Sequence, residues 1–308
     1  MRIYLKQLAG IIACGLMLSA TAGAAAAASS VPYEDHYAVN GGVRLHYVAT
    51  GKGPLVIMLH GFPEYWGFYR GLMEELKGQY RVAAIDLRGY NLSDKPVGEA
   101  AYAMPLLVGD VEAVIRAEGG QKAIIIGHDW GAAIAWQVAM TRPDLVTRLV
   151  AMSVPHPSGF ARELATDPVQ QKNSQYARNF QIPGFEKNLT PELFTRNAPA
   201  EIKAEWTEAL SRSDFTSLLN YYRANYPKTT GDTSTLATTS PTVPITAPVL
   251  VIHGLQDSAL QAAGHAGTWD HVTADTTLLM IPSAGHDVQH DAAGLVNQTI
   301  HDWLKARP

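Results

Sequence analysis

The 308-residue sequence predicts an α/β fold, in which helices cover both faces of a mostly parallel sheet and a helical cap is inserted between two strands. Two observations lead to this prediction. From about Tyr37, short apolar runs alternate with longer amphipathic segments, as in consecutive strand–helix units. Between Pro157 and Pro244 this alternation stops, and the sequence is polar, rich in aromatic residues and helical in pattern. A charged fraction of 17% and a net charge of −4, without basic runs, argue against a nucleic-acid-binding surface.

Each predicted element rests on a local pattern. Short apolar runs bounded by turn-forming residues predict strands at Val43–Val48, Leu55–Leu59, Arg81–Leu87, Ala123–Ile126, Leu149–Val154, Val249–His253 and Leu278–Ile281. Longer runs with apolar residues three or four positions apart predict helices at Tyr65–Leu76, Pro105–Ala117, Ala132–Met140 and Leu295–Leu304. The Thr-, Ser- and Pro-rich residues 229–244 predict a linker back to the sheet. We therefore assign residues 31–156 and 245–308 to the core and residues 157–244 to the cap.

The first 28 residues have the pattern of a secretory signal peptide. Arg2 and Lys6 precede an apolar stretch, and an alanine-rich run ends at Ala28. The apolar stretch is shorter than the roughly 20 residues that span a bilayer, which disfavours a membrane anchor. We expect an exported protein, periplasmic or secreted, with no membrane contact after cleavage. Cys14, the one cysteine of the sequence, lies in this segment, so the mature chain would contain no disulfide.

A candidate nucleophile lies between two glycines. The segment Gly127-His128-Asp129-Trp130-Gly131 follows a predicted strand and opens a helix, which is the pattern of a nucleophile elbow. The flanking glycines allow a sharp turn that raises the central side chain above the carboxyl end of the sheet. A carboxylate is already ionised at neutral pH and attacks without a base. Its best targets are saturated carbons with a leaving group. A helix-capping aspartate is the alternative, which the two glycines disfavour.

The acid and the base are expected later in the chain, in the order nucleophile, acid, histidine. Asp257 lies in the loop after the strand Val249–His253, and His286 lies after Leu278–Ile281. His286 would activate water, and Asp257 would fix its tautomer and stabilise the imidazolium. The competing His290 lies within or beside the last helix, where a solvated role is favoured.

The loop of residues 60–63 is a candidate for the oxyanion hole. With an elbow of this kind, the loop after the first parallel strand supplies one backbone N–H, and the residue after the nucleophile supplies the other. These donors would be Phe62 and Trp130, which would stabilise the charge that develops when an ester is hydrolysed. We also expect His60, Pro63 and Trp130 to line the substrate pocket. A plain strand-to-helix turn is the alternative, which would explain Gly61 and Pro63 alone.

Taken together, several motifs resemble those of the epoxide hydrolases of the α/β-hydrolase superfamily, in particular the exported bacterial type. The similar segments are His60-Gly61-Phe62-Pro63-Glu64, Asp86-Leu87-Arg88-Gly89-Tyr90, Ser93-Asp94-Lys95-Pro96, Gly127-His128-Asp129-Trp130-Gly131, Pro155-His156-Pro157 and Gly285-His286-Asp287-Val288-Gln289. The resemblance covers about residue 31 to the C-terminus. It implies an α/β-hydrolase fold and hydrolysis of a small-molecule epoxide to a vicinal diol through a covalent aspartyl ester, without a cofactor or a metal.

The resemblance also implies two cap tyrosines that hold and protonate the epoxide oxygen. Tyr176 precedes the segment Phe180-Gln181-Ile182-Pro183-Gly184, and Tyr222 lies in Asn220-Tyr221-Tyr222-Arg223. An alkoxide is a poor leaving group, so a phenol with a pKa of about 10 would supply a proton as the ring opens. Packing in an aromatic cap core is the alternative for each tyrosine.

Two positions depart from the pattern of many relatives. Asn91 stands in place of a glycine, and Asp287 follows His286 where an aromatic residue is frequent. Asp287 would place a carboxylate near His286. Some exported relatives carry the triad acid after the strand that here ends near Ser153, and a serine cannot take that role, which favours Asp257.

Two other functions are compatible with parts of the pattern. Haloalkane dehalogenases share the aspartate nucleophile and Trp130 but need further nitrogen donors for the halide. Phe62 stands where such a donor is common, although Trp206 lies in the cap. A halide leaves without a proton, so the tyrosine pair favours an epoxide. The third hypothesis is a non-catalytic ligand-binding protein on this fold. Such proteins often lack a triad member, whereas the predicted triad here is complete.

Overall fold

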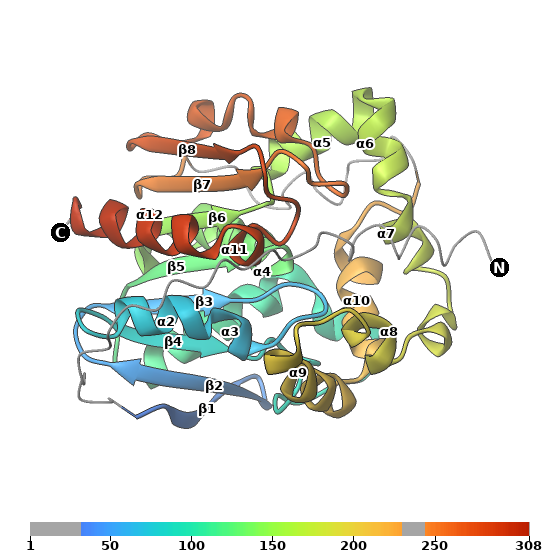
Figure 1. Cartoon of the computed structure of the whole chain (residues 1–308), viewed down its shortest axis with the longest axis horizontal. Coiled ribbons are helices and arrows are strands. Elements are labelled where there is room, and N and C mark those ends of the chain that lie inside the picture. Colours follow the sequence, from blue (N-terminus) through green and yellow to red (C-terminus); the bar gives the residue numbers. More distant parts are fainter. Residues whose placement is uncertain (1–31, 230–243, 308) are drawn as a thin grey trace.

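The computed structural model describes residues 32–229 and 244–307 (Figure 1). The predicted signal peptide, residues 1–28, and nearly all of the predicted linker lie outside these residues, so export stays a prediction. None of the helices in the described ranges combines the length and apolar character needed to cross a membrane.

The centre of the molecule is an eight-stranded sheet with the order β1-β2-β4-β3-β5-β6-β7-β8. The strands are β1 Glu34–Asn40, β2 Val43–Gly51, β3 Leu55–Leu59, β4 Arg81–Ile85, β5 Ala123–His128, β6 Val146–Met152, β7 Val249–Gly254 and β8 Thr276–Ile281. The pairs β1–β2 and β2–β4 are antiparallel, and the pairs from β4 to β8 are parallel. The predicted fold class, a mostly parallel α/β sheet, is confirmed.

Helices bury both faces of the sheet. On β3, Val56 and Met58 belong to one apolar core, and Ile57 and Leu59 belong to the other, because successive strand residues point to opposite faces. The helices α2 Arg70–Leu76, α11 Val288–Asp291 and α12 Ala293–Lys305 cover the first core, and α3 Met104–Ala117 and α4 Trp130–Thr141 cover the second (Figure 1). The parallel strands are therefore buried on both sides, as their continuous apolar sequences require.

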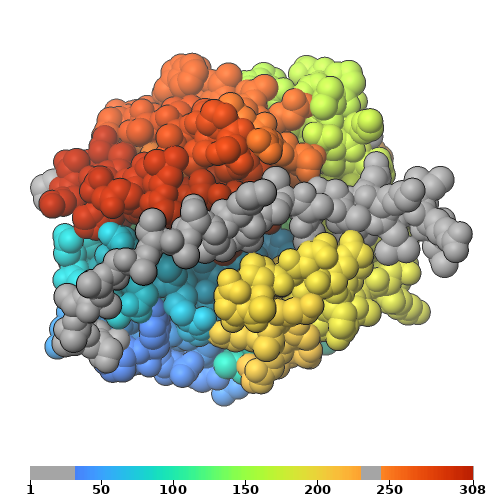
Figure 2. Space-filling view, in the orientation of Figure 1, coloured from blue at the N-terminus to red at the C-terminus, as the bar shows by residue number. Residues whose placement is uncertain are grey.

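Between β6 and β7 the chain forms a helical segment at the carboxyl end of the sheet (Figure 1). Its helices are α5 Pro157–Thr166, α6 Pro168–Asn173, α7 Gln175–Asn179, α8 Pro191–Thr195, α9 Ala200–Arg212 and α10 Phe215–Asn225. In Figure 2 its yellow residues lie directly against the cyan residues that follow β3. Among the contacts that join these regions are two polar ones: Arg70 forms a two-point ion pair with Glu205 at 2.7 and 3.0 Å, and the Trp206 indole donates a hydrogen bond to the Pro63 carbonyl at 3.0 Å.

Two elements differ from the sequence prediction. The first strand, β1, was not predicted, because it is an edge strand in which Ala38 alone is fully buried and the apolar alternation is weak. The predicted helix Tyr65–Leu76 is divided into a 3-10 turn, η1 Trp66–Tyr69, and the α-helix α2. The backbone N–H of Trp66 donates to Asp86 Oδ1 at 3.0 Å, which holds the start of η1 against the end of β4.

The turn between β5 and α4 depends on glycine at two positions. A Cβ on Gly127 would lie 2.3 Å from the Gly131 carbonyl oxygen, and a Cβ on Gly131 would lie 1.9 Å from the Leu59 carbonyl oxygen. Between them, Asp129 has a φ of 49°, in the left-handed region that L-residues rarely occupy. The close approach of α4 to β3 thus forces the sharp turn that presents Asp129.

We expect Gly131→Ala to destabilise the protein by about 3 kcal/mol or more, because the added methyl group overlaps backbone atoms of β3 that cannot move aside. The matched control is Gly294→Ala in α12, where a Cβ would meet nothing within 4 Å. That substitution should stabilise by about 0.4–1 kcal/mol through the unfolded chain. Urea unfolding of both variants measures the difference. Equal stability of the two variants would contradict the packing described for the turn.

Candidate active site

Asp129 is the N-cap of α4 and is 8% exposed. Its Oδ1 accepts a hydrogen bond of 2.8 Å from the backbone N–H of Phe62, and its Oδ2 lies 3.3 Å from Nε2 of His286. The positive end of the α4 dipole favours a negative charge at this position. One carboxylate oxygen is therefore held by the β3 loop, and the other faces the histidine.

The two predicted oxyanion donors lie on either side of Asp129. Phe62 already donates its N–H to Asp129, while Trp130 is the first residue of α4, so its N–H has no acceptor within the helix. The Phe62 ring packs into the cap, with its centroid 5.3 Å from Phe180 and 5.6 Å from Phe194. This packing fixes the loop that carries the Phe62 N–H.

Asp257 and His286 meet as the sequence predicts. Nδ1 of His286 lies 2.8 Å from Oδ2 of Asp257, whose Oδ1 accepts hydrogen bonds from the backbone of Ala259 at 2.7 Å and of Leu260 at 2.9 Å. These bonds fix the carboxylate, which has no exposed side-chain surface. Burial alone would raise the pKa of Asp257, but the charge of His286 and its hydrogen bond hold that pKa below its usual value.

The pKa of His286 is raised well above its usual value. Burial alone would lower it, but the negative charge of Asp257 and the hydrogen bonds to Asp129 and Asp257 reverse the effect. Both ring nitrogens face carboxylates, Nδ1 that of Asp257 and Nε2 that of Asp129. The imidazolium is stabilised by two negative charges, one of which belongs to the candidate nucleophile.

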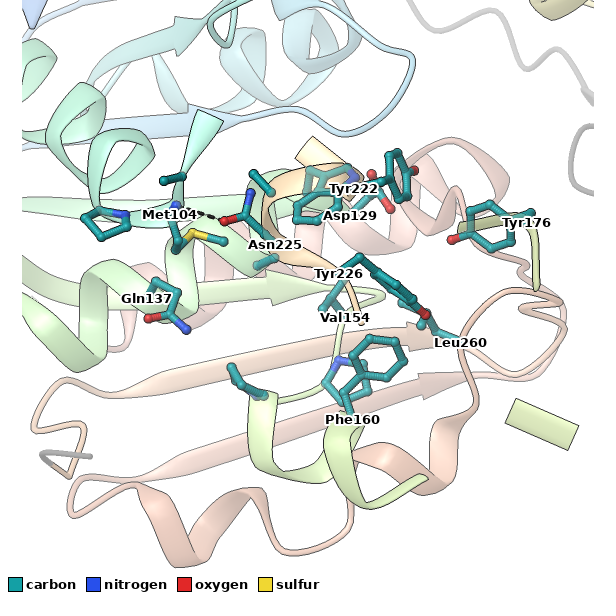
Figure 3. Close-up of a pocket in the computed structure, with 17 residues that line it drawn as sticks. Met104, Asp129, Gln137, Val154, Phe160, Tyr176, Tyr222, Asn225, Tyr226 and Leu260 are labelled. Carbon is teal, nitrogen blue, oxygen red and sulfur yellow. Dashed lines mark hydrogen bonds between the residues drawn. The ribbon is translucent and has the colours of Figure 1, made fainter. Parts of the chain in front are cut away.

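Tyr176 and Tyr222 come from the cap helices α7 and α10, and their ring centroids lie 6.2 Å apart. Burial raises the pKa of both hydroxyls well above the usual value, and the charge of Asp129 acts in the same direction. Both side chains are thus protonated at neutral pH and can donate a hydrogen bond. Figure 3 shows Tyr222 beside Asp129 and Tyr176 farther to the right.

Asp129, Trp130, Tyr176 and Tyr222 line one cavity of about 310 Å³ (Figure 3). The other residues of its wall are Ala103, Met104, Pro105, Ala133, Gln137, Val154, Pro155, Pro157, Phe160, Ala224, Asn225, Tyr226 and Leu260. Most of these side chains are apolar, so the cavity suits a small apolar substrate.

Two residues that we expected in the pocket lie outside its wall. His60 is completely buried, with Nδ1 2.8 Å from the Gly61 carbonyl oxygen and Nε2 accepting a hydrogen bond of 3.1 Å from the Leu87 N–H. Pro63 faces α9, where its carbonyl accepts the Trp206 indole hydrogen bond. Neither His60 nor Pro63 is among the residues that line this cavity, so their role in substrate binding stays a prediction. Trp130 does line the cavity.

Glu64, to which we had given no role, joins the three loops that carry the site. Its Oε2 accepts a hydrogen bond of 2.9 Å from the Gly61 N–H and lies 3.2 Å from Nδ1 of His128. Its Oε1 accepts a hydrogen bond of 3.0 Å from Gln289 and lies 3.6 Å from Nε2 of His290. Glu64 is 4% exposed. A charge in an otherwise apolar segment, next to Pro63, was the sequence signal for this role.

The Glu64–His128 contact is a buried ion pair. Burial alone would raise the pKa of Glu64, but the charge and hydrogen bond of His128 hold it well below its usual value. Burial alone would lower the pKa of His128, and the charge of Glu64 raises it instead. Nε2 of His128 lies 3.0 Å from the carbonyl oxygen of His286. The pair thus reaches the backbone of the candidate base.

Among the described residues, one group could offer three metal ligands within 4.8 Å of one another, namely His128, His286 and Asp287. Both nitrogens of His286 face carboxylates, and those of His128 face Glu64 and a carbonyl oxygen. These hydrogen bonds occupy the nitrogens, so the arrangement fits a triad better than a metal centre. The Asp287 carboxylate, which we expected near His286, lies 4.0 Å from Nε2 of His128 and is 47% exposed.

This chain is similar in sequence and structure to known α/β-hydrolases. The sequence profile of the alpha/beta hydrolase fold family matches residues 54–293. Epoxide hydrolase 3 of Xenopus tropicalis is 33% identical over 293 residues, which cover 86% of this chain and 75% of the relative. Epoxide hydrolase 4 of Homo sapiens is 32% identical over 285 residues, with coverage of 86% and 76%. A crystal structure of an epoxide hydrolase variant from Bacillus megaterium, complexed with its diol product, has a TM-score of 0.78 and 30% identity, with coverage of 88% and 100%.

The fold and the arrangement of aspartate, acid and histidine at the carboxyl edge of the sheet define an α/β-hydrolase, and the chain belongs to that family. Its relatives place it further: it is an epoxide hydrolase. The predicted enzyme class is confirmed.

We expect Glu64→Ala to destabilise the enzyme by about 3–5 kcal/mol, because the substitution leaves His128 buried without its partner. Activity per folded molecule should fall as well, since three catalytic loops lose a common anchor. Glu64→Gln, which keeps hydrogen-bonding atoms, should cost less. Chemical unfolding and kcat of the folded fraction are the measurements. Glu201→Ala, an exposed carboxylate of α9, is the control and should stay within about 0.5 kcal/mol. A Glu64→Ala variant as stable and active as this control would exclude the anchoring role.

Proposed function

We propose that this enzyme opens its epoxide through a covalent ester on Asp129, which water then hydrolyses with His286 as base. One observation carries the proposal. Asp129 lines the cavity, and its two oxygens have different surroundings: Oδ1 is bound by the Phe62 N–H, and Oδ2 lies 3.3 Å from Nε2 of His286. Oδ2 is thus suited to attack, while Oδ1 already occupies the place that a developing oxyanion needs.

In the first step Oδ2 of Asp129 attacks a ring carbon, and the bond from that carbon to the epoxide oxygen breaks. The oxygen leaves toward Tyr176 and Tyr222, which donate hydrogen bonds, and one of them transfers its proton. The product is a hydroxyalkyl ester of Asp129 and one tyrosinate. Both tyrosines line the cavity that Asp129 lines, which supports their role as the acid pair.

In the second step His286 takes a proton from water, and the resulting hydroxide attacks the ester carbonyl carbon. Negative charge develops on Oδ1 between the N–H groups of Phe62 and Trp130. The ester bond then breaks and releases the diol, and the water oxygen remains in the Asp129 carboxylate. The two protons of the water restore the tyrosine hydroxyl and complete the second hydroxyl of the diol.

The charge of Asp129 controls when His286 acts as a base. While Asp129 is ionised, its charge and hydrogen bond raise the pKa of His286 and keep the ring protonated. Ester formation removes that negative charge and leaves Asp257 as the remaining carboxylate beside the ring. The pKa of His286 then falls, so the ring releases its proton to the solvent and can accept one from water; it is protonated from the solvent again once Asp129 is ionised.

The dehalogenase alternative finds less support in the site. That reaction needs a second nitrogen donor for the halide, for which Trp206 was the candidate. Its indole N–H is bonded to the Pro63 carbonyl at 3.0 Å, and Trp206 does not line the cavity. The non-catalytic alternative is disfavoured because Asp129, Asp257 and His286 are present and in contact.

We expect His286→Gln to alkylate Asp129 normally and to stop there, because glutamine cannot accept a proton from water. The variant should accumulate an adduct equal in mass to the whole epoxide, visible by intact-mass spectrometry and located on Asp129 by peptide mapping. His301→Gln is the control: this histidine lies on α12, where its ring contacts Gln79 and Asp302, and the variant should turn over without an adduct. The absence of an adduct with any epoxide that the wild type hydrolyses would exclude the two-step route.

We expect the double substitution of Tyr176 and Tyr222 by Phe to slow alkylation by about 10²–10⁴-fold, the usual loss for a positioned acid. Each single change should cost less, because the other hydroxyl still faces the leaving oxygen. Single-turnover kinetics should show the loss in alkylation and leave ester hydrolysis nearly unchanged. Tyr37→Phe at an exposed position is the control. Full activity of the double variant would exclude the acid pair and reopen the dehalogenase reading.

A further inference from the structure

The cavity extends well beyond the reacting groups, along one face of α4. Asp129, Ala133 and Gln137 all line it and are spaced four residues apart, which places them on the same side of the helix. Eight residues of α-helix rise by about 12 Å. The cavity therefore has a long arm that begins at the candidate nucleophile and reaches Gln137. Figure 3 shows Gln137 and Tyr176 at opposite ends of this space.

The walls of this arm are mostly apolar. Met104, Pro105 and Ala133 line it together with Gln137. The polar side chain of Asn225 also lies on the wall, but its amide is occupied: Oδ1 accepts a hydrogen bond of 2.9 Å from the Met104 N–H, and Nδ2 donates to the carbonyl groups of Tyr102 and Tyr221. Asn225 thus holds the wall together and offers little to a ligand.

Gln137 differs from Asn225 in this respect. Its side chain is partly exposed, it lines the cavity, and within the described residues its amide makes no hydrogen bond. An amide offers two N–H donors and a carbonyl acceptor. A ligand atom that covers these groups without bonding to them removes their water and leaves them unsatisfied, which weakens binding. A ligand with a hydrogen-bonding group at that point satisfies them.

We propose that Gln137 forms a second subsite that selects epoxides with an apolar chain ending in a hydroxyl, carbonyl or amide group. This inference rests on the proposed function, since it places the epoxide between Asp129 and the tyrosine pair. The ring binds at one end of the cavity, the apolar chain follows α4 past Ala133, and the polar end bonds to the Gln137 amide. Gln137 is a specificity-determining residue and takes no part in the chemical steps.

The test compares two series of terminal epoxides of increasing chain length, one ending in a primary amide and one ending in a methyl group. In the wild type, kcat/KM for the amide series should pass through a maximum at the length that reaches Gln137, and there exceed the methyl series by about tenfold, the value of one good hydrogen bond. The preference should appear in KM, with kcat similar, because the contact is the same before and during reaction.

Gln137→Leu should remove the maximum and reduce the preference to near unity, while the methyl series binds as well as before or better. Gln298→Leu on the exposed face of α12 is the matched control for loss of an amide and should keep the wild-type pattern. Gln137→Met, which retains the unbranched shape, provides a second variant if Gln137→Leu does not fold. A wild type without a length-dependent preference, or a preference that survives in Gln137→Leu, would overturn the subsite.

Styrene oxide, which is too short to reach Gln137, separates this proposal from the proposed function. Wild type and Gln137→Leu should hydrolyse it equally and form the same Asp129 ester in a His286→Gln background. Loss of that ester would count against the reaction route. An intact ester with no preference between the two series would count against the subsite alone.

Discussion

The site depends on one buried carboxylate, that of Glu64. It contacts the loop after β3 through Gly61, the elbow after β5 through His128, and the loop after β8 through Gln289. Strands β3 and β5 are neighbours, but β6 and β7 separate β5 from β8, so the sheet alone does not bring the histidine loop to the nucleophile. A buried ion pair adds little net stability, because desolvation offsets most of the attraction. Its effect here is positional, since Glu64 can satisfy all these groups in one arrangement only.

Near Glu64, the pKa of His286 depends on the charge of Asp129. Two carboxylates hold the pKa of His286 high, while the His128 imidazolium beside it acts in the opposite direction. Of the charges around His286, those of Asp257 and His128 stay constant, and the charge of Asp129 is the one that can change. In the proposed route, the acid–base state of His286 follows whether Asp129 carries a negative charge or an ester.

The sequence predicted the parts of the structure that are encoded locally. The buried strands, the elbow around Asp129, and the loops of Asp257 and His286 each lie within a few residues of a clear pattern. Contacts between distant segments were not predictable in this way: Glu64 was visible as a charge beside Pro63, but its partners His128 and Gln289 come from two other loops. Gln137 was likewise visible as a polar residue in an apolar helix, eight positions after Asp129. Its direction into the cavity depends on how α4 packs. Asn91, which replaces a glycine, has a φ of 38°, which asparagine tolerates better than most residues.

The position of Phe62 shows how closely the two parts of the chain are joined. Its N–H belongs to the catalytic core, whereas its ring lies among Phe180, Phe194 and Tyr222 of the cap. The pocket that holds the ring is therefore formed by cap residues, whereas the N–H that would stabilise the oxyanion belongs to the core. A cap transplanted from a relative would change the cavity wall and also the pocket that holds the Phe62 ring. Residue 62 would then have to be exchanged together with the cap. Through Phe62, a change in the cap that alters the substrate range also alters the position of a catalytic N–H group.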